Sequence, residues 1–290
     1  ERELISGYFE KIGLSGGIYS IKINGSKIKK EADMRDHKDA IELLIRELLD
    51  NKIIKSLDEI DGIGHRLVHG GDKYASSVVI TDDVINTVKE LSSLAPLHNP
   101  ANILGVEAFR EALPNTPMVG VFDTAFHQTM GEEQYLYSVP LDWYKEYQIR
   151  KYGFHGTSHK YITKVMQEKL GRDDINLISC HIGSGASICA IKNGKSFDTT
   201  MGFTPNAGLI MGTSSGDIDY SVIPYYINKT GATLSEVDNI LNKKSGLLGI
   251  SGKYSDHRDI ESAMEDGDQD AILANNMYIN RVVEYIAKYY

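Results

Sequence analysis

Two tight-turn signals, each set among alternating strands and each followed by helical segments, constrain the fold of this chain most. The first is Asn24-Gly25, which lies inside the alternating pattern of residues 18–32. The second is Asn193-Gly194, which lies inside the strand-like region of residues 176–200. An Asn-Gly pair between alternating apolar runs is the strongest short-range signal for a β-hairpin. A hairpin-rich sheet followed by helices thus occurs twice, which predicts two similar α/β domains with a cleft between them.

The remaining elements are predicted from apolar periodicity and capping residues. In the first half, Asp36 and Thr81 are helix caps, and Asn99-Pro100 opens a helix that runs through residue 112. Further strands are expected in IDGIGHRLVHGG (60–71), where the strand ends in the double glycine, at 77–80 and at 118–122. In the second half, helices are expected at 217–228, 233–243, 256–265 and 268–290. The last of these helices is expected to face the core with Ile272, Leu273, Met277, Ile279, Val282, Val283 and Ile286.

Length and charge narrow the class of protein. A chain of 290 residues is longer than one core usually grows, so we expect domains at 1–124 and 125–290. The net charge of −9 argues against a nucleic acid or an anionic membrane as partner. Cys180 and Cys189 form no CxxC pair, which favours a reducing cytoplasm over a disulfide framework. No run approaches the ~18–20 apolar residues of a membrane span.

Three polar side chains of the first half are candidates for binding an anion. Arg66 and Val68 alternate along a predicted strand, so a cation and an apolar surface would share one face, as a short carboxylate requires. His98 lies directly before a predicted helix start, where backbone donors meet anions. Asp123 follows a buried-type strand, at the edge where α/β folds bind ligands. Each residue also has a structural alternative: Arg66 could form a surface ion pair, His98 could be structural, and Asp123 could begin a turn.

Two glycine-flanked motifs of the second half are further candidates. His155 and His159 have the i, i+4 spacing of a zinc site, but no glutamate follows His155 and Gly156 disfavours a helix that begins there. A catalytic histidine in a hinged loop is therefore the better hypothesis. The turn in CHIGSGAS (180–187) can present N–H groups to phosphate, although it is neither a Walker loop nor a Rossmann fingerprint.

Seven motifs follow one another along nearly the whole chain: GHRLVHGG, LAPLHNPAN, VFDTAFHQTM, KYGFHGTSHKY, CHIGSG, MGFTPNAGLIMGT and SGDID. In this order they resemble the acetokinase family, the acetate kinases of the actin-like ATPase superfamily. The resemblance implies two actin-like (ribonuclease H-like) domains that form a homodimer. It also implies Mg²⁺-dependent transfer of a phosphoryl group from ATP to acetate, giving acetyl phosphate and ADP.

The resemblance also implies roles for individual residues. Arg66 would bind the carboxylate or the phosphoryl group with His98 nearby, and the methyl pocket would be lined by Val68, Leu97 and Pro205. Asp123 would be the catalytic carboxylate, close to Mg²⁺, and His155 would stabilise the transferring group. The phosphate loop would be His181, Ile182, Gly183, Ser184 and Gly185, and the nucleotide would also contact Asp256, His257 and Arg258.

The chain departs from the family pattern at the loop LIMGTSSGDIDY (209–220). The family places a transition-state arginine where Ser214 stands here, and an asparagine where Ser184 stands. The chain resembles an internal segment: the family's first strand with its NAGSSS-type phosphate loop, and its GIGEN-type adenosine loop with a glutamate near the metal, lie outside it. Ser214 therefore predicts an impaired enzyme and leaves the activity of this exact chain open.

Three alternative functions follow from the same residues. A non-catalytic acetokinase-like protein would also carry Ser214, and a propionate kinase would share most of the motifs. A zinc hydrolase built on His155 and His159 is the third alternative.

Overall fold

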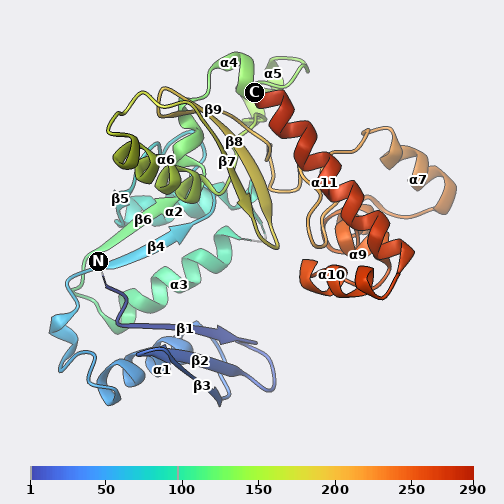
Figure 1. Cartoon of the computed structure of the whole chain (residues 1–290). Helices are drawn as coiled ribbons and strands as arrows, with labels where there is room; N and C mark the ends of the chain where they lie inside the picture. Colours follow the sequence, from blue (N-terminus) through green and yellow to red (C-terminus); the bar gives the residue numbers. More distant parts are fainter. Residues whose placement is uncertain (1, 97) are drawn as a thin grey trace. The chain divides into compact units, whose positions relative to one another are not determined.

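The computed structural model describes residues 2–96 and 98–290, which fall into two compact units (Figure 1). Unit 1 comprises Glu1–His69 and Ser77–Val121, and unit 2 comprises Gly70–Ser76 and Phe122–Tyr290. Among the described residues, no helix combines the length and the apolar character that crossing a bilayer requires.

Unit 1 begins with an antiparallel sheet of three strands in the order β1-β2-β3. The strands are β1 (Ile5–Glu10), β2 (Ile18–Ile23) and β3 (Ser26–Glu31). Asn24 and Gly25 both have positive φ, 50° and 83°, which is the backbone that a two-residue hairpin turn requires. The predicted hairpin is thus confirmed, whereas β1 was not expected.

Helix α1 (His37–Asp50) is joined to this sheet by a buried carboxylate. The side chain of Asp36 accepts hydrogen bonds from two first-turn amides, so the predicted cap is confirmed. Glu47 of α1 is 4% exposed and accepts from Tyr19 Oη at 2.6 Å and from Lys30 Nζ at 2.5 Å. Asn51 Nδ2 donates to its second carboxylate oxygen at 2.9 Å. One carboxylate therefore ties together two strands and a helix.

The second sheet of unit 1 has the strand order β4-β6-β5, with β5 and β6 antiparallel. Its elements are β4 (Ile63–Leu67), β5 (Val78–Val79) and β6 (Met118–Phe122), with η1 (Leu57–Glu59), α2 (Asp82–Glu90), η2 (Leu91–Ser93) and α3 (Asn99–Ala112). Thr81 caps α2 as predicted. The N-cap residue of α3 is His98, not Asn99. The side chain of Asn99 is buried, where its Oδ1 accepts from the His69 amide and its Nδ2 donates to the His69 carbonyl.

Unit 2 contains an antiparallel sheet in the order β7-β8-β9, covered by helix α6 (Figure 1). The strands β7 (Leu177–Ile182), β8 (Ala186–Lys192) and β9 (Lys195–Thr199) confirm the predicted ones. Ahead of the sheet lie η3 (Ala125–Thr129), α4 (Glu132–Tyr135), α5 (Asp142–Tyr147) and α6 (Gly156–Leu170). We expected Gly156 to disfavour a helix at this point, but α6 begins there. The first turn tolerates this glycine, and a larger residue would clash with the carbonyl oxygen of Asp123.

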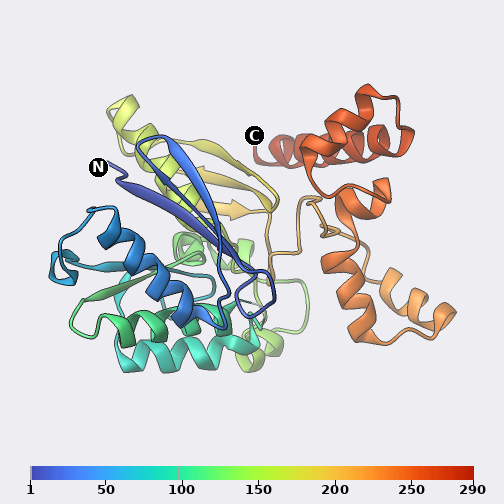
Figure 2. The same cartoon turned by 90° about the horizontal axis from the view of Figure 1, so that it is seen from below.

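The C-terminal helices of unit 2 pack in two sets, α7 with α8, and α9 with α10 and α11 (Figure 2). They are α7 (Val222–Thr230), α8 (Leu234–Lys243), α9 (Gly246–Ser251), α10 (His257–Glu265) and α11 (Gln269–Tyr289). Helix α9 was not predicted, and α7 begins five residues later than expected, at 222 rather than 217. The predicted inward face of α11 is mostly wrong: of its seven residues, Ile272 is half-buried and Val282 packs against the buried cluster, whereas Leu273, Met277, Ile279, Val283 and Ile286 are exposed. The buried face is formed by Ala271, Ala274 and Tyr278. The small alanines let α11 approach α9 and α10 closely.

We predict that Glu47→Gln lowers the free energy of unfolding by about 1–3 kcal/mol near neutral pH, because a charged acceptor is lost from a buried network. Burial raises the pKa of Glu47, but hydrogen bonds from Lys30 and Tyr19 outweigh it and hold the pKa below 4.5. A lowered folded-state pKa stabilises the fold above the unfolded value and loses that effect as the pH falls through the folded value. The two proteins should therefore converge in urea unfolding as the pH falls through the lowered folded-state pKa of Glu47.

The matched control is Glu42→Gln, an exposed position on the same helix, which should change stability by less than ~0.5 kcal/mol. Equal losses for both variants, or a Glu47→Gln loss that persists at acid pH, would contradict the account.

Candidate active site

His155 is held at the start of α6 by an unusual backbone conformation. It is the N-cap residue, with left-handed φ of 57° and ψ of 18°. The next amide, of Gly156, donates to the carbonyl oxygen of Asp123 at 2.9 Å. A Cβ on Gly156 would lie 2.2 Å from that same oxygen, so no larger residue fits there without a backbone shift. This contact fixes the backbone of Asp123, which is 1% exposed, next to Gly156. Because His155 directly precedes Gly156, the same contact also fixes His155.

The His155 ring lies among histidines and serines of α6 and the sheet. Its Nδ1 is 2.9 Å from Ser187 Oγ, and the ring stacks on His181 with centroids 4.1 Å apart. A Cβ on Gly185 would lie 3.5 Å from His155 Nε2, so that nitrogen faces the glycine-rich turn between β7 and β8. The predicted catalytic histidine and the predicted phosphate loop are thus neighbours within unit 2.

His159 is engaged in a way that disfavours zinc. Its Nδ1 is 3.0 Å from Ser179 Oγ and its Nε2 is 2.9 Å from Ser187 Oγ. Burial, and then the like charges of neighbouring histidines, lower the pKa of His159 to about 2, and burial lowers that of His127 to about 4. Among the described residues, no three or more His, Cys, Asp and Glu side chains gather as a metal site would require. Both rings are therefore neutral parts of the core at neutral pH.

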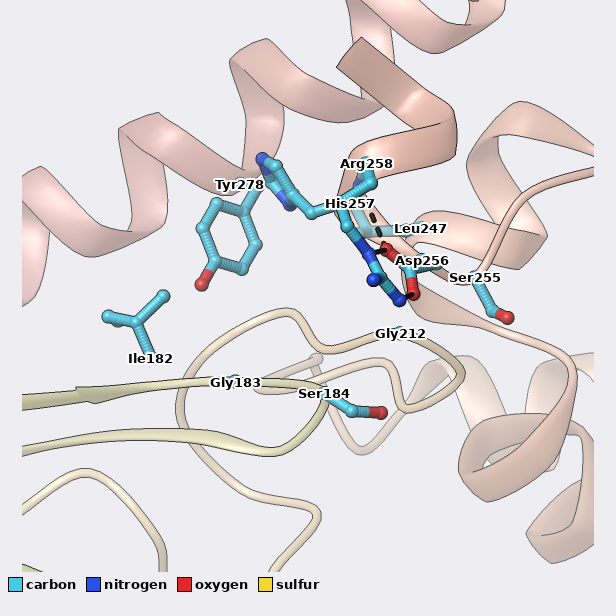
Figure 3. A pocket seen from close by; sticks show the side chains of 10 residues that line it. All are labelled: Ile182, Gly183, Ser184, Gly212, Leu247, Ser255, Asp256, His257, Arg258 and Tyr278. Carbon is cyan, nitrogen blue, oxygen red and sulfur yellow. Dashed lines mark hydrogen bonds and ion pairs between the residues drawn. The ribbon is translucent and has the colours of Figure 1, made fainter. Parts of the chain in front are cut away.

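A cavity of about 530 Å³ lies beside the turn, entirely within unit 2 (Figure 3). It is lined by Ile182, Gly183, Ser184, Gly212, Leu247, Ser255, Asp256, His257, Arg258 and Tyr278. Six of these ten are residues that the resemblance connects with the nucleotide, from two segments about 70 positions apart. The structure therefore brings the turn after β7 and the start of α10 into one cavity. Sequence reasoning missed Gly212, Leu247, Ser255 and Tyr278.

Gly212, from the loop 209–220, lies where these two segments meet. Its amide donates to Ser184 O at 3.2 Å, and a Cβ there would lie 2.7 Å from Ser255 O. Its own carbonyl accepts from the amide of Leu248 in α9 at 3.0 Å. The loop therefore connects the turn, the start of α10 and α9, and only glycine leaves room for that approach. The paired glycines in the loop's sequence were the available signal.

The start of α10 presents both charge and aromatic surface to the cavity. Arg258 forms a two-point ion pair with Asp256, with nitrogen to oxygen distances of 3.0 and 2.6 Å, and lowers the pKa of that carboxyl to about 2 (Figure 3). The His257 ring packs edge-on against Tyr278 with centroids 4.8 Å apart, and its Nε2 is 3.2 Å from Asn275 Oδ1.

Ser214 is directed away from the lining of this cavity. Its hydroxyl donates to the carbonyl of Asn242 at the end of α8 at 3.1 Å, and its own carbonyl accepts from the amide of Met211 at 3.1 Å. The half-buried serine therefore closes the loop onto α8 and presents no cation.

The remaining predicted residues are described within their own units. In unit 1, Arg66 and His98 are exposed and Val68 is 7% exposed. Strand β4 ends at Leu67, so the alternation argument does not extend to Val68. In unit 2, Pro205 is half-buried. Leu97 lies outside the described residues, and convergence of the two sets remains a prediction.

Comparison with known proteins matches the sequence model of the Acetokinase family over residues 1–290. The acetate kinase of Bacillus cytotoxicus is 55% identical over 291 residues, which span 100% of this chain and 73% of that protein. The Porphyromonas gingivalis acetate kinase structure has a TM-score of 0.93 at 48% identity, and covers 99% of this chain and 73% of its own. A propionate kinase structure from Francisella tularensis has a TM-score of 0.95 at 42% identity, over 99% and 74% of the two chains.

The fold and these matches define an actin-like α/β phosphotransferase with a carboxyl group as acceptor. The chain belongs to the acetokinase family.

We predict that Gly156→Ala destabilises the protein by at least ~1–3 kcal/mol, because the added Cβ would overlap the Asp123 carbonyl. The control is Gly105→Ala in α3, where nothing lies within 4 Å and a gain of about 0.5–1 kcal/mol is expected. Thermal unfolding of both variants measures the difference. A Gly156→Ala variant as stable as the parent would show that the contact does not constrain the site.

Proposed function

We propose that this protein catalyses reversible transfer of the γ-phosphoryl group of ATP to acetate, giving acetyl phosphate and ADP. The observation that carries this proposal is the cavity of about 530 Å³, lined both by the turn 182–184 and by residues 255–258. Ligand pockets for small molecules typically measure about 300–1,000 Å³, so a nucleotide is within range. Family membership and the names of the relatives support the same reaction.

The cavity offers a different surface to each part of a nucleotide. Gly183 and Ser184 lie at an open turn whose N–H groups suit phosphate oxygens. At the start of α10, Asp256 caps the helix and pairs with Arg258, so this side of the cavity offers paired polar groups that suit the hydroxyls of a nucleoside. Ile182, Leu247 and Tyr278 form an apolar wall for the base. We assign the phosphates to the turn and the nucleoside to the α10 side.

For the acceptor end, the proposed roles follow the resemblance to the family. We propose that Arg66 holds the acetate carboxylate, with His98 nearby and with Val68, Leu97 and Pro205 around the methyl group. Asp123 is the catalytic carboxylate, and His155 donates from Nε2 to the phosphoryl oxygens as charge develops. Phosphoryl transfer is catalysed mainly by positioning and electrostatic stabilisation, which is what such a set of donors supplies.

Mg²⁺ would accompany the nucleotide. It is commonly held by one or two carboxylates together with substrate phosphates, so a cage of several protein ligands is not required. Asp123, buried at the end of β6, is the carboxylate that suits this role. When bound, the ion would supply positive charge beside the phosphates, and Asp123 would help to hold it there.

Ser214 is the reason to expect a slow enzyme. Its hydroxyl is bonded to the Asn242 carbonyl and cannot replace the forked donors and fixed charge of an arginine. The same observation favours a second function, a nearly inactive acetokinase-like protein that still binds ligands. Propionate is the alternative acceptor, since the related F. tularensis structure is that of a propionate kinase. We further propose a cytoplasmic homodimer with no nucleic-acid or membrane partner.

We predict that Ser214→Arg raises kcat for acetyl phosphate formation by about 10³–10⁵-fold, the usual effect of a transition-state arginine. The Michaelis constant for acetate should change little, because that arginine acts on the transition state more than on bound acetate. Propionate should be a poorer but real substrate, since one methylene changes discrimination by only ~1–3 kcal/mol. Trapping acyl phosphate as the hydroxamate measures all three quantities.

The matched control is Ser215→Arg, which adds the same cation one residue further along the loop. The backbone at this position is fixed, since the Ser215 amide donates to the Leu241 carbonyl at 2.9 Å. It should give no gain. A parent protein as fast as Ser214→Arg would show that Ser214 does not limit the reaction. Absence of acyl phosphate from every variant would favour the non-catalytic function.

A further inference from the structure

Ser187 is a buried hydroxyl between two histidines, and the proposed reaction assigns it no role. It is the second residue of β8, lies opposite His181 in the sheet and is 0% exposed. Its Oγ is 2.9 Å from His155 Nδ1 and 2.9 Å from His159 Nε2. The chain of contacts continues from His159 Nδ1 to Ser179 Oγ at 3.0 Å.

The hydrogen-bond directions in this chain are coupled. A serine hydroxyl has one proton, so Ser187 donates to one histidine and accepts from the other. His159 is neutral, because burial lowers its pKa to about 2, so one of its ring nitrogens donates and the other accepts. If His159 donates from Nε2 to Ser187, then Ser187 donates to Nδ1 of His155. A neutral His155 must then carry its proton on Nε2.

The position of that proton matters because His155 Nε2 faces the turn. A Cβ on Gly185 would lie 3.5 Å from it, whereas Nδ1 points to Ser187. Only a protonated Nε2 can donate to an anion held at the turn. The opposite direction of the chain would place the proton of neutral His155 on Nδ1 and turn a lone pair toward the anion.

We propose that Ser187 is a positioning residue, which donates to Nδ1 of His155 and so keeps the ring proton on Nε2, the nitrogen that faces the phosphate-binding turn. This inference rests on the proposed role of His155 in phosphoryl transfer. The hydroxyl can also accept from Nδ1 if His155 becomes a cation, so Nε2 carries a proton in both states.

The tautomer can be measured directly, with or without catalysis. In protein labelled with ¹⁵N-histidine, long-range ¹H–¹⁵N correlations should show His155 protonated on Nε2. Ser187→Ala should shift its ring ¹⁵N signals toward a mixture of tautomers, and Ser187→Thr, which keeps a hydroxyl, should restore the parent pattern. The matched control is Ser196→Ala, which removes the hydroxyl 2.7 Å from His127 Nδ1 in the same unit and should leave the His155 signals unchanged. His155 protonated on Nδ1, or ring signals that Ser187→Ala does not move, would overturn the proposal.

Kinetics separate this inference from the proposed function. Ser187→Ala should lower kcat by roughly 10-fold, the scale of one lost hydrogen bond, and change the Michaelis constant for acetate by less than about 2-fold. In a His155→Ala background the same change should have no further effect on kcat. A damaging His155→Ala with a harmless Ser187→Ala would overturn the positioning role alone. A harmless His155→Ala would overturn the proposed role of His155 itself.

Discussion

The hydrogen bond from the Gly156 amide to the Asp123 carbonyl is the contact on which the rest of the site depends. Within unit 2 it joins Asp123, the residue after β6, to the start of α6, more than 30 residues later in the sequence. The 2.2 Å clearance at Gly156 leaves no room for a side chain, so helix and strand end approach as closely as backbones can. His155 takes its left-handed conformation at this junction, and its ring lies between Ser187 of β8 and the turn at Gly185.

The same use of glycine recurs where the cavity is assembled. Gly212 brings the loop 209–220 within bonding distance of Ser184 and into contact with the backbone of Ser255. Neither the turn nor the start of α10 forms a binding surface alone, and the loop holds them together. Ser214, two residues after Gly212 in the same loop, donates its hydroxyl to the Asn242 carbonyl and so closes the loop against α8. The loop therefore borders a cavity of about 530 Å³ and places a neutral hydroxyl, not a cation, at position 214.

Local elements could be predicted from the sequence wherever local chemistry decides them. Asn193-Gly194 forms its turn with φ of 51° and 72°, and Asp36 and Thr81 cap helices, because each effect acts within a few residues. Features that depend on distant parts of the chain could not be predicted. The buried face of α11 follows its alanines, and Tyr278 joins the cavity only because that face packs on α9 and α10. For the site, the motifs indicated which segments carry chemistry, and the glycines of the loop 209–220 were a signal, whereas the contact of Gly212 with both Ser184 and Ser255 emerges only from the tertiary structure.

We propose that the turn after β7 and the start of α10 form one nucleotide site. The most direct test is a titration of ¹⁵N-labelled protein with ADP and Mg²⁺, in which the backbone ¹H–¹⁵N shifts are measured. The account predicts that the largest shifts occur together in residues 182–184, at Gly212 and in residues 255–258, with one common saturation curve. Shifts confined to one of these segments, or centred on another part of unit 2, would contradict it.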